Sequence, residues 1–123
     1  MNLGERLLEY GVQIIKVMEL LPRTRVCGQI GGELLRSGTS VGAHYEEAQG
    51  AESRNDFIHK LQVALKELRE ANYWLRLLAR SEKLPATRLA GILDESNQLR
   101  AMLSKAVATA KGKAKARVPS SFL

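Results

Sequence analysis

Apolar residues recur every three or four positions along most of this 123-residue chain, and this spacing restricts the fold more than any other feature. Steps of three and four place residues on one face of an α-helix. Four such series can be followed, over residues 3–21, 26–48, 57–78 and 89–110. No segment shows the alternation of apolar and polar residues that is typical of a half-buried strand. The pattern predicts an all-α protein with four amphipathic helices.

The links between these series are short, and two of them contain proline. Pro22 ends the first series and Pro85 precedes the fourth, because proline disfavours helical geometry in the residue before it. Ser53 is a candidate N-cap of the third helix, with Asp56 in the first turn. Short links make consecutive helices antiparallel. We therefore predict that residues 1–110 form one antiparallel up-down-up-down four-helix bundle.

The second predicted helix is rich in glycine, and each glycine inside a helix costs about 1 kcal/mol relative to alanine. Either packing against another helix holds it together, or it is broken into two pieces. The face opposite its apolar series carries small residues at intervals of four and seven, namely Gly28, Gly32, Thr39 and Ala43. Such a face lets a second helix approach closely, within the chain or between chains. The alternative is that these glycines only mark a bend.

The third predicted helix carries more apolar residues than one bundle core can bury. With Phe57 at 0° and an advance of about 100° per residue, the core stripe includes Leu61 and Leu75. Three large residues fall outside this stripe, namely Tyr73, Trp74 and Leu77. Surplus apolar surface is typical of an interface with a partner. The alternative is that Trp74 packs under the following link.

Basic residues are concentrated at the carboxyl end of the sequence. Residues 111–123 contain no acid and four cations, namely Lys111, Lys113, Lys115 and Arg117. Without these four the net charge falls from +6 to +2, because 15 basic and 13 acidic residues remain. A segment this poor in apolar residues is predicted to be a disordered basic tail.

Six further cations flank the first and third links, namely Arg23, Arg25, Arg76, Arg80, Lys83 and Arg88. In an antiparallel bundle these two links lie at the same end, so the six side chains form one basic end. Clustered Lys and Arg attract phosphate groups whatever the base sequence. Together with the tail, they are the predicted contacts to RNA or DNA. The alternative is ordinary solvation of helix ends.

Candidates for metal or catalytic chemistry are weak. Asp56 with His59, and His44 with Glu47, have the Glu-x-x-His type of spacing used in di-iron bundles, but His59 faces away from the core stripe. We predict no metal site and no cofactor, and interpret His44 as a hydrogen-bonded residue at the boundary of the core.

Nucleophilic chemistry is equally weakly supported. Ser37, Thr39 and Ser40 lie near His44, but such neighbours are common on helices, and small polar residues also allow tight packing. Cys27 is the single cysteine, which excludes an internal disulfide, and we expect a buried or idle thiol. The prediction is that the protein is not an enzyme.

No apolar run approaches the roughly 18 residues that a membrane span requires. Glu5 and Glu9 interrupt the region where a signal peptide needs an uncharged apolar core. We expect a soluble cytoplasmic protein without membrane contact.

The motif residues resemble a known family. Leu34–Ala43 reads LLRSGTSVGA, and it is followed by Glu46-Glu47-Ala48, Asp56–Leu61 (DFIHKL), Ala64–Glu67 (ALKE) and Tyr73-Trp74-Leu75. Over roughly residues 5–108 this pattern is similar to the four-helix-bundle proteins of the 23S rRNA intervening-sequence family. The basic tail is outside the shared pattern, and His44 stands where the family usually has Asn.

The resemblance implies an antiparallel four-helix bundle that assembles into a ring-shaped homopentamer, without an established enzymatic activity. Relatives act as accessory variability proteins of retroelements, where a basic pentamer engages a reverse transcriptase and nucleic acid. We therefore expect a non-enzymatic homo-oligomer that binds RNA, DNA or a nucleic-acid enzyme through a basic surface. The alternative is a purely structural or protein-interaction module with no nucleic-acid role.

Overall fold

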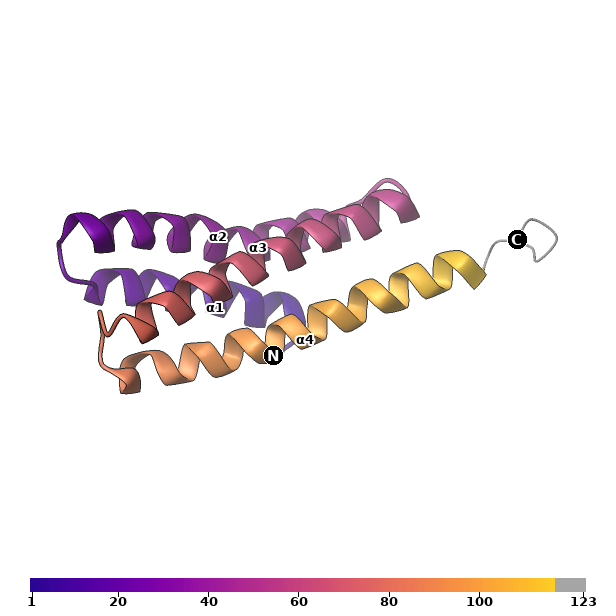
Figure 1. The fold of residues 1–123 in the computed structure, drawn as a ribbon. Helices are drawn as coiled ribbons and strands as arrows, with labels where there is room; N and C mark the ends of the chain where they lie inside the picture. Colours follow the sequence, from indigo (N-terminus) through magenta and orange to yellow (C-terminus); the bar gives the residue numbers. More distant parts are fainter. Residues whose placement is uncertain (117–123) are drawn as a thin grey trace.

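Four helices account for nearly all of residues 1–116, the part of the chain that the computed structural model describes. They are α1 (Leu3–Leu20), α2 (Arg25–Gln49), α3 (Arg54–Arg80) and α4 (Ala86–Ala116), and they pack side by side (Figure 1). The prediction of an all-α four-helix bundle is confirmed for this part of the chain. None of the four helices, as far as described, is both long enough and apolar enough to cross a membrane.

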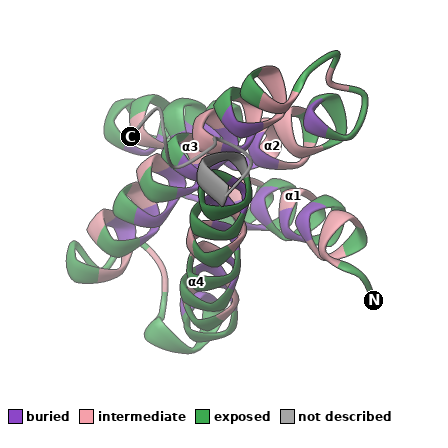
Figure 2. Ribbon diagram, turned by 90° about the vertical axis from the view of Figure 1, so that its right-hand side faces the viewer, coloured by how far each residue is buried: buried purple, intermediate pink, exposed green. Residues whose placement is uncertain are grey.

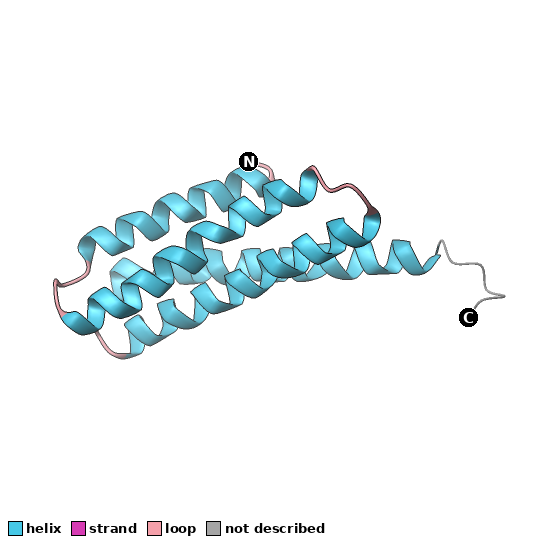
Figure 3. Cartoon of the chain, turned by 90° about the horizontal axis from the view of Figure 1, so that it is seen from above, coloured by secondary structure: helices cyan, strands magenta, loops and turns pink. Residues whose placement is uncertain are grey.

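The chain turns back on itself at each of the three links, as Figures 1 and 3 show from two sides. The helices form a cycle, in which α1 and α3 each pack against both α2 and α4. α1 and α2 are antiparallel, because Gly42 lies against Leu7 while Gly31 lies against Met18. The links 21–24 and 81–85 therefore lie at one end of the bundle, and the link 50–53 lies at the other.

Side-chain caps fix where the first three helices begin. Asn2 Oδ1 accepts a hydrogen bond from the Glu5 amide at 2.9 Å, and Thr24 Oγ1 accepts one from the Cys27 amide at 3.1 Å. Ser53 Oγ accepts from the Asp56 amide at 3.1 Å, which confirms Ser53 as the N-cap of α3. Each of these bonds satisfies an amide that has no partner inside its helix.

The buried side chains lie on the sides of the helices that face one another (Figure 2). Leu7, Tyr10 and Ile14 of α1 are buried as the spacing predicts. The apolar series that begins at residue 26 predicts a buried side chain at Val26, and this is wrong, because Val26 is 54% exposed and its neighbour Cys27 is buried instead. The inward stripe of α2 starts one residue later than predicted, and the expected burial of the Cys27 thiol is confirmed.

Glycines hold α2 close to α1, and α2 is one continuous helix. A Cβ at Gly38 would lie 2.7 Å from Ile14 Cγ1, and one at Gly31 would lie 2.8 Å from the Met18 side chain. Real Cβ atoms essentially never come that near to a neighbour. At Gly31 the neighbour is the flexible end of Met18, which can move aside, whereas at Gly38 it is the branched side chain of the buried Ile14, so the helix spacing depends on glycine at Gly38. Packing within the chain therefore offsets the low helix propensity of α2.

The last helix extends past residue 110, where the sequence predicts the end of the bundle. α4 continues through Ala116, so Lys111, Lys113 and Lys115 belong to this helix. The rest of the predicted tail, including Arg117, lies outside the described residues.

Candidate nucleic-acid interface

Two links that are far apart in the sequence bring six cations to one end of the bundle. All six predicted side chains are exposed, namely Arg23, Arg25, Arg76, Arg80, Lys83 and Arg88. No carboxylate within residues 1–113 forms an ion pair with any of them. Glu19 and Glu82 are the acids nearest to these links in the sequence, so the basic end keeps a positive excess. Both links lie at the same end of the bundle, so these exposed cations lie at or near that end.

The positive charge continues from this end along the outer face of α3. Lys66, Arg69, Arg76 and Arg80 are exposed at intervals of three, seven and four residues, which keeps them on one side of the helix. Tyr73 lies among them and is 54% exposed. Lys66 and Arg69 were not among the predicted contacts, because the predicted set held only cations near the links and in the tail. The helical spacing from Lys66 to Arg80 was the signal that would have found them.

The two acids in the middle of α3 pair with a residue of α2 and not with these cations. Glu67 and Glu70 both bind Arg36 of α2, and the Arg36–Glu67 contact measures 3.0 Å. Hydrogen bonding to Glu70 raises the pKa of the Arg36 guanidinium above its usual value. In this part of α3 the acids thus pair with α2, and the exposed cations of the outer face have no acidic partner within residues 1–113.

Trp74 lies on the acidic side of α3 and is half-buried against the core. Its Nε1 donates a hydrogen bond to Glu70 Oε2 at 3.2 Å, and its ring meets Tyr73 edge-on with centroids 5.2 Å apart. Leu77 is half-buried and borders a small hollow with Tyr73 and Arg76. Of the three apolar residues predicted for an interface, Tyr73 is the one whose ring is mainly exposed.

The lysines near the end of α4 project to two sides of this helix. Lys111 lines a shallow groove together with Lys66 and Arg69, and so adds to the basic face of α3. Lys113 lines a separate cleft near the start of α3. The basic end formed by the two links lies at the opposite end of the bundle from both lysines (Figure 1). The cations predicted as one set therefore fall into separate groups.

The small residues predicted as an oligomer interface lie on the outer side of α2. Gly28 and Gly32 are exposed, and a Cβ at either position would meet nothing within 4 Å. Thr39 and Ala43 instead line an apolar groove of about 690 Å³ between α1 and α2. The close approach of α2 to another helix within the chain uses different glycines, on its inward side.

Exposed apolar side chains of α1 form the other wall of this groove. Leu8, Val12 and Ile15 follow the intervals of one helical face, and Leu8 is 70% exposed. They were not among the predicted interface residues, because the prediction for this helix covered only its core face. A second apolar face on α1 is the signal that would have revealed them.

The hydroxyl groups in the middle of α2 donate hydrogen bonds to backbone carbonyls of the same helix. Ser37 Oγ donates to the Glu33 carbonyl at 2.9 Å, and Ser40 Oγ donates to the Arg36 carbonyl at 2.5 Å. His44 is partly exposed, and its Nδ1 lies 3.7 Å from Glu47 Oε2. Within the described residues, no three His, Cys, Asp or Glu side chains gather to hold a metal ion. The hydroxyl groups and His44 in this region thus make local contacts along α2.

A buried polar cluster joins α4 to its two neighbours. Tyr10 Oη lies 3.0 Å from Ser96 Oγ, and the Asn72 amide donates to Ser96 Oγ at 3.2 Å and to Asn97 at 3.1 Å. Burial raises the pKa of Tyr10 to about 12, although the Ser96 hydrogen bond partly opposes this shift. Nearer the surface, Arg6 pairs with Glu95 at 2.6 Å. These contacts fix the position of α4 and leave the basic surfaces free.

Comparison with known proteins identifies the family. The family model for the 23S rRNA-intervening sequence protein matches residues 5–105. This chain belongs to that family. No curated protein matches the chain. It is also similar to the crystal structure of a protein of unknown function from the S23 ribosomal protein family of Bacteroides thetaiotaomicron, with 36% identity and a TM-score of 0.80. That similarity covers 86% of this chain and 98% of the other.

Proposed function

We propose that this family member is a non-enzymatic homo-oligomer that binds RNA or DNA through its basic surface. The observation that carries the proposal is the line of exposed cations along α3, which runs from Lys66 to Arg80 and joins the basic end at the links. Phosphate groups are attracted to such a surface through counterion release, whatever the base sequence. The same proposal includes a protein partner, namely a reverse transcriptase or another protein that handles nucleic acid. Nucleic acid bound to the basic surface would bridge this partner and the bundle.

The arrangement of the arginines favours this function over a purely structural role. A module that only assembles with proteins would have these cations scattered or paired with acids. Here Glu67 and Glu70 of α3 pair with Arg36 of α2, and the outer cations from Lys66 to Arg80 have no carboxylate partner within residues 1–113. The exposed ring of Tyr73 lies between Arg69 and Arg76, where a nucleic-acid base can stack on it.

Self-association is supported by the apolar groove between α1 and α2. Leu8, Val12 and Ile15 expose a row of large side chains beside Thr39 and Ala43, and such a patch is unusual on a monomer. We propose that this groove is the contact between copies, and that the assembly is the homopentamer implied by the family resemblance.

Nucleic-acid binding is tested with labelled single-stranded and duplex RNA and DNA at two salt concentrations. If about four phosphates are contacted, affinity falls about 100-fold between roughly 50 and 200 mM salt. The double variant Lys83→Glu/Arg88→Glu should bind at least about tenfold more weakly, with a salt slope reduced by about two. The matched control Arg54→Glu/Lys105→Glu makes the same charge change away from the basic end. No binding of the natural chain at low salt refutes the proposal.

Self-association is tested by light scattering. The natural chain should have about five times the 13.6 kDa mass of one copy. Val12→Glu places a charge in the groove and should reduce the mass toward that of a single copy. Val26→Glu is the matched control, because Val26 is 54% exposed and does not line the groove. A natural chain of 13.6 kDa contradicts this part of the proposal.

A further inference from the structure

One corner of the bundle lacks a helix over part of its length. α1 begins at Leu3, whereas α3 and α4 continue beyond that level toward Arg54 and Ala116. Figure 1 shows the last turns of α4 extending past α1. In this stretch α4 has a neighbour on the α3 side, and the position in line with α1 is open. The open position is a cleft of about 600 Å³ with Leu3 at its base.

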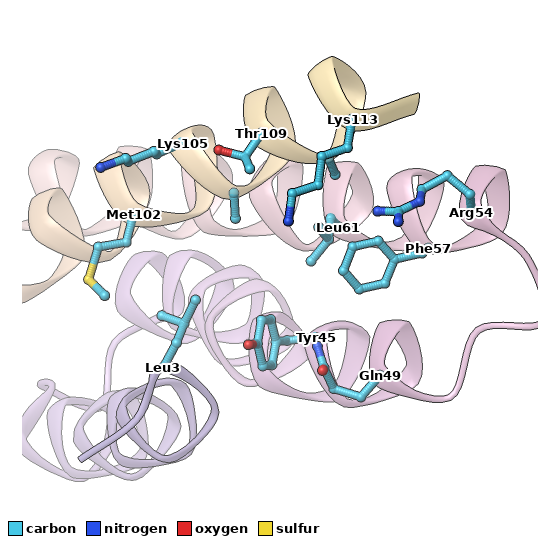
Figure 4. Close-up of a pocket in the computed structure, with 12 residues that line it drawn as sticks. Leu3, Tyr45, Gln49, Arg54, Phe57, Leu61, Met102, Lys105, Thr109 and Lys113 are labelled. Atoms are coloured by element: carbon cyan, nitrogen blue, oxygen red, sulfur yellow. The ribbon is translucent and has the colours of Figure 1, made fainter. Parts of the chain in front are cut away.

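Apolar side chains from all four helices line this cleft. Figure 4 shows Leu3 of α1, Tyr45 of α2, Phe57 and Leu61 of α3, and Met102 of α4 around one hollow. Phe57 and Tyr45 are only half-buried, although they pack against the core. The cleft thus continues the apolar interior of the bundle to the surface.

Cations border the apolar surface, and no acid does so among the residues that line the cleft. Arg54 comes from the start of α3, while Lys105 and Lys113 come from α4. Figure 4 shows Arg54 and Lys113 reaching toward the same part of the hollow. Within residues 1–113, none of the three forms an ion pair. An occupant with apolar residues on one side and carboxylates on its flanks therefore complements this site.

We propose that the cleft binds an acidic amphipathic helix of a partner protein, which takes the position that α1 leaves open. Each wall of the cleft is long enough to contact two turns of such a helix. From Arg54 to Leu61, and from Ala106 to Lys113, each wall runs about 10 Å, or two turns of helix. The apolar face of the helix packs on Phe57, Leu61 and Ala106, and its acidic flanks meet the three cations. This is the helix-in-groove mode of recognition.

The site is distinct from the basic surface of the proposed function. It lies at the far end of the bundle from the two basic links, and its apolar lining distinguishes it from the basic face of α3. One molecule is therefore able to hold nucleic acid on its basic surface and a protein helix in this cleft. Neither activity requires the other, and their tests can be separated.

Fluorescence anisotropy of a labelled 14-residue peptide tests the proposal. The probe carries Leu at positions one, four, eight and eleven, Glu on the flanks, and blocked termini. A second peptide replaces each Glu by Lys, and a third keeps Glu but contains two central prolines. We expect the acidic helical peptide to bind at least about tenfold more tightly than either. Equal binding of the Glu and Lys peptides overturns the proposal, because charge complementarity then plays no part.

Protein variants locate the binding. Arg54→Glu/Lys105→Glu should weaken peptide binding at least about tenfold and leave nucleic-acid binding intact, whereas Lys83→Glu/Arg88→Glu should do the opposite. A second pair of variants tests the site without changing its charge. Thr109→Trp fills the cleft, while Ala101→Trp adds the same ring at an exposed position that does not line the cleft. Unchanged peptide binding by Thr109→Trp refutes the site. A fall in assembly mass on adding peptide also refutes it, because a second copy is then the natural occupant.

Discussion

The contact between α1 and α2 and the contacts that hold α4 are built on different principles. α1 and α2 meet through small residues, with Gly31 and Gly38 letting the Met18 and Ile14 side chains of α1 come close to the backbone of α2. α4 is instead joined to α1 and α3 through the buried Tyr10, Ser96 and Asn72 side chains, and these share hydrogen bonds. The first contact depends on close fit, and the second adds a buried polar cluster to the apolar packing of Leu89, Leu99 and Leu103.

This difference determines what each contact tolerates. A shape-dependent contact excludes added volume, because a filled interior has no space for another methyl group. A polar contact depends on the protonation of its members and loses stability when a buried group must ionise. The α1–α2 contact should therefore be sensitive to substitution of its glycines, and the α4 contact should be sensitive to pH.

The largest effect is expected for Gly38→Val. Even a Cβ at this position lies 2.7 Å from Ile14 Cγ1, and Ile14 is fully buried, so α1 and α2 must move apart. Overpacking of this kind costs about 2–3 kcal/mol of folding free energy, which exceeds the few tenths gained in helix propensity. Urea unfolding monitored by circular dichroism should show a lower midpoint with an unchanged slope. An unchanged midpoint would mean that the two helices do not depend on glycine for their spacing.

Tyr10→Phe tests the polar contact and should have an intermediate effect. Near pH 8 the loss of the hydrogen bond to Ser96 should cost about 1 kcal/mol. Burial holds the pKa of Tyr10 at about 12 in the folded chain, above its ordinary value of 10.0. The folded state thus binds this proton more tightly, so the contribution is complete below pH 10 and is lost as pH rises toward 12.

The natural chain should accordingly lose about 2–3 kcal/mol over this range through Tyr10, and the Phe variant should not. The stability difference between the two proteins should shrink or reverse in alkaline solution. Urea midpoints measured from pH 8 to pH 11.5 check this, with Tyr73→Phe as the control because Tyr73 is 54% exposed. Parallel pH profiles for natural chain and Tyr10→Phe would exclude a buried, protonated Tyr10.

The helix pattern was readable from the sequence because it depends on local spacing and on caps such as Ser53. The roles of the glycines were not readable, since they depend on which side of α2 meets α1. Spacing alone selected the exposed Gly28 and Gly32, whereas the tertiary contact uses Gly31 and Gly38. A stripe of glycines offers no hydrophobic signal. The predicted core face of α2 was wrong at its start, where Val26 is exposed and Cys27 is buried instead, and right at Leu34 and Val41.

The candidate sites also differ in whether the sequence predicts them. The basic end follows from the order of the helices, because antiparallel packing brings the two links together wherever the cations lie within them. The basic face of α3 follows from helical spacing once Lys66 and Arg69 are counted. The cleft beside Arg54 does not follow from any local pattern. It exists because α1 is shorter than the helices around it, and this depends on how the four helices are aligned along the bundle.

The smallest effect, of opposite sign, is expected for Gly32→Ala. Gly32 lies on the same helix as Gly38, but a Cβ there meets nothing within 4 Å, so the added methyl group has no steric cost. Alanine restricts the unfolded chain and favours the helix, which should stabilise the protein by about 0.5–1 kcal/mol. A rise in the urea midpoint checks this. Because the two substitutions then act in opposite directions, the cost at Gly38 belongs to the contact with α1 rather than to the loss of glycine. A fall in stability that grows with protein concentration would instead mean that a helix of a second copy approaches Gly32.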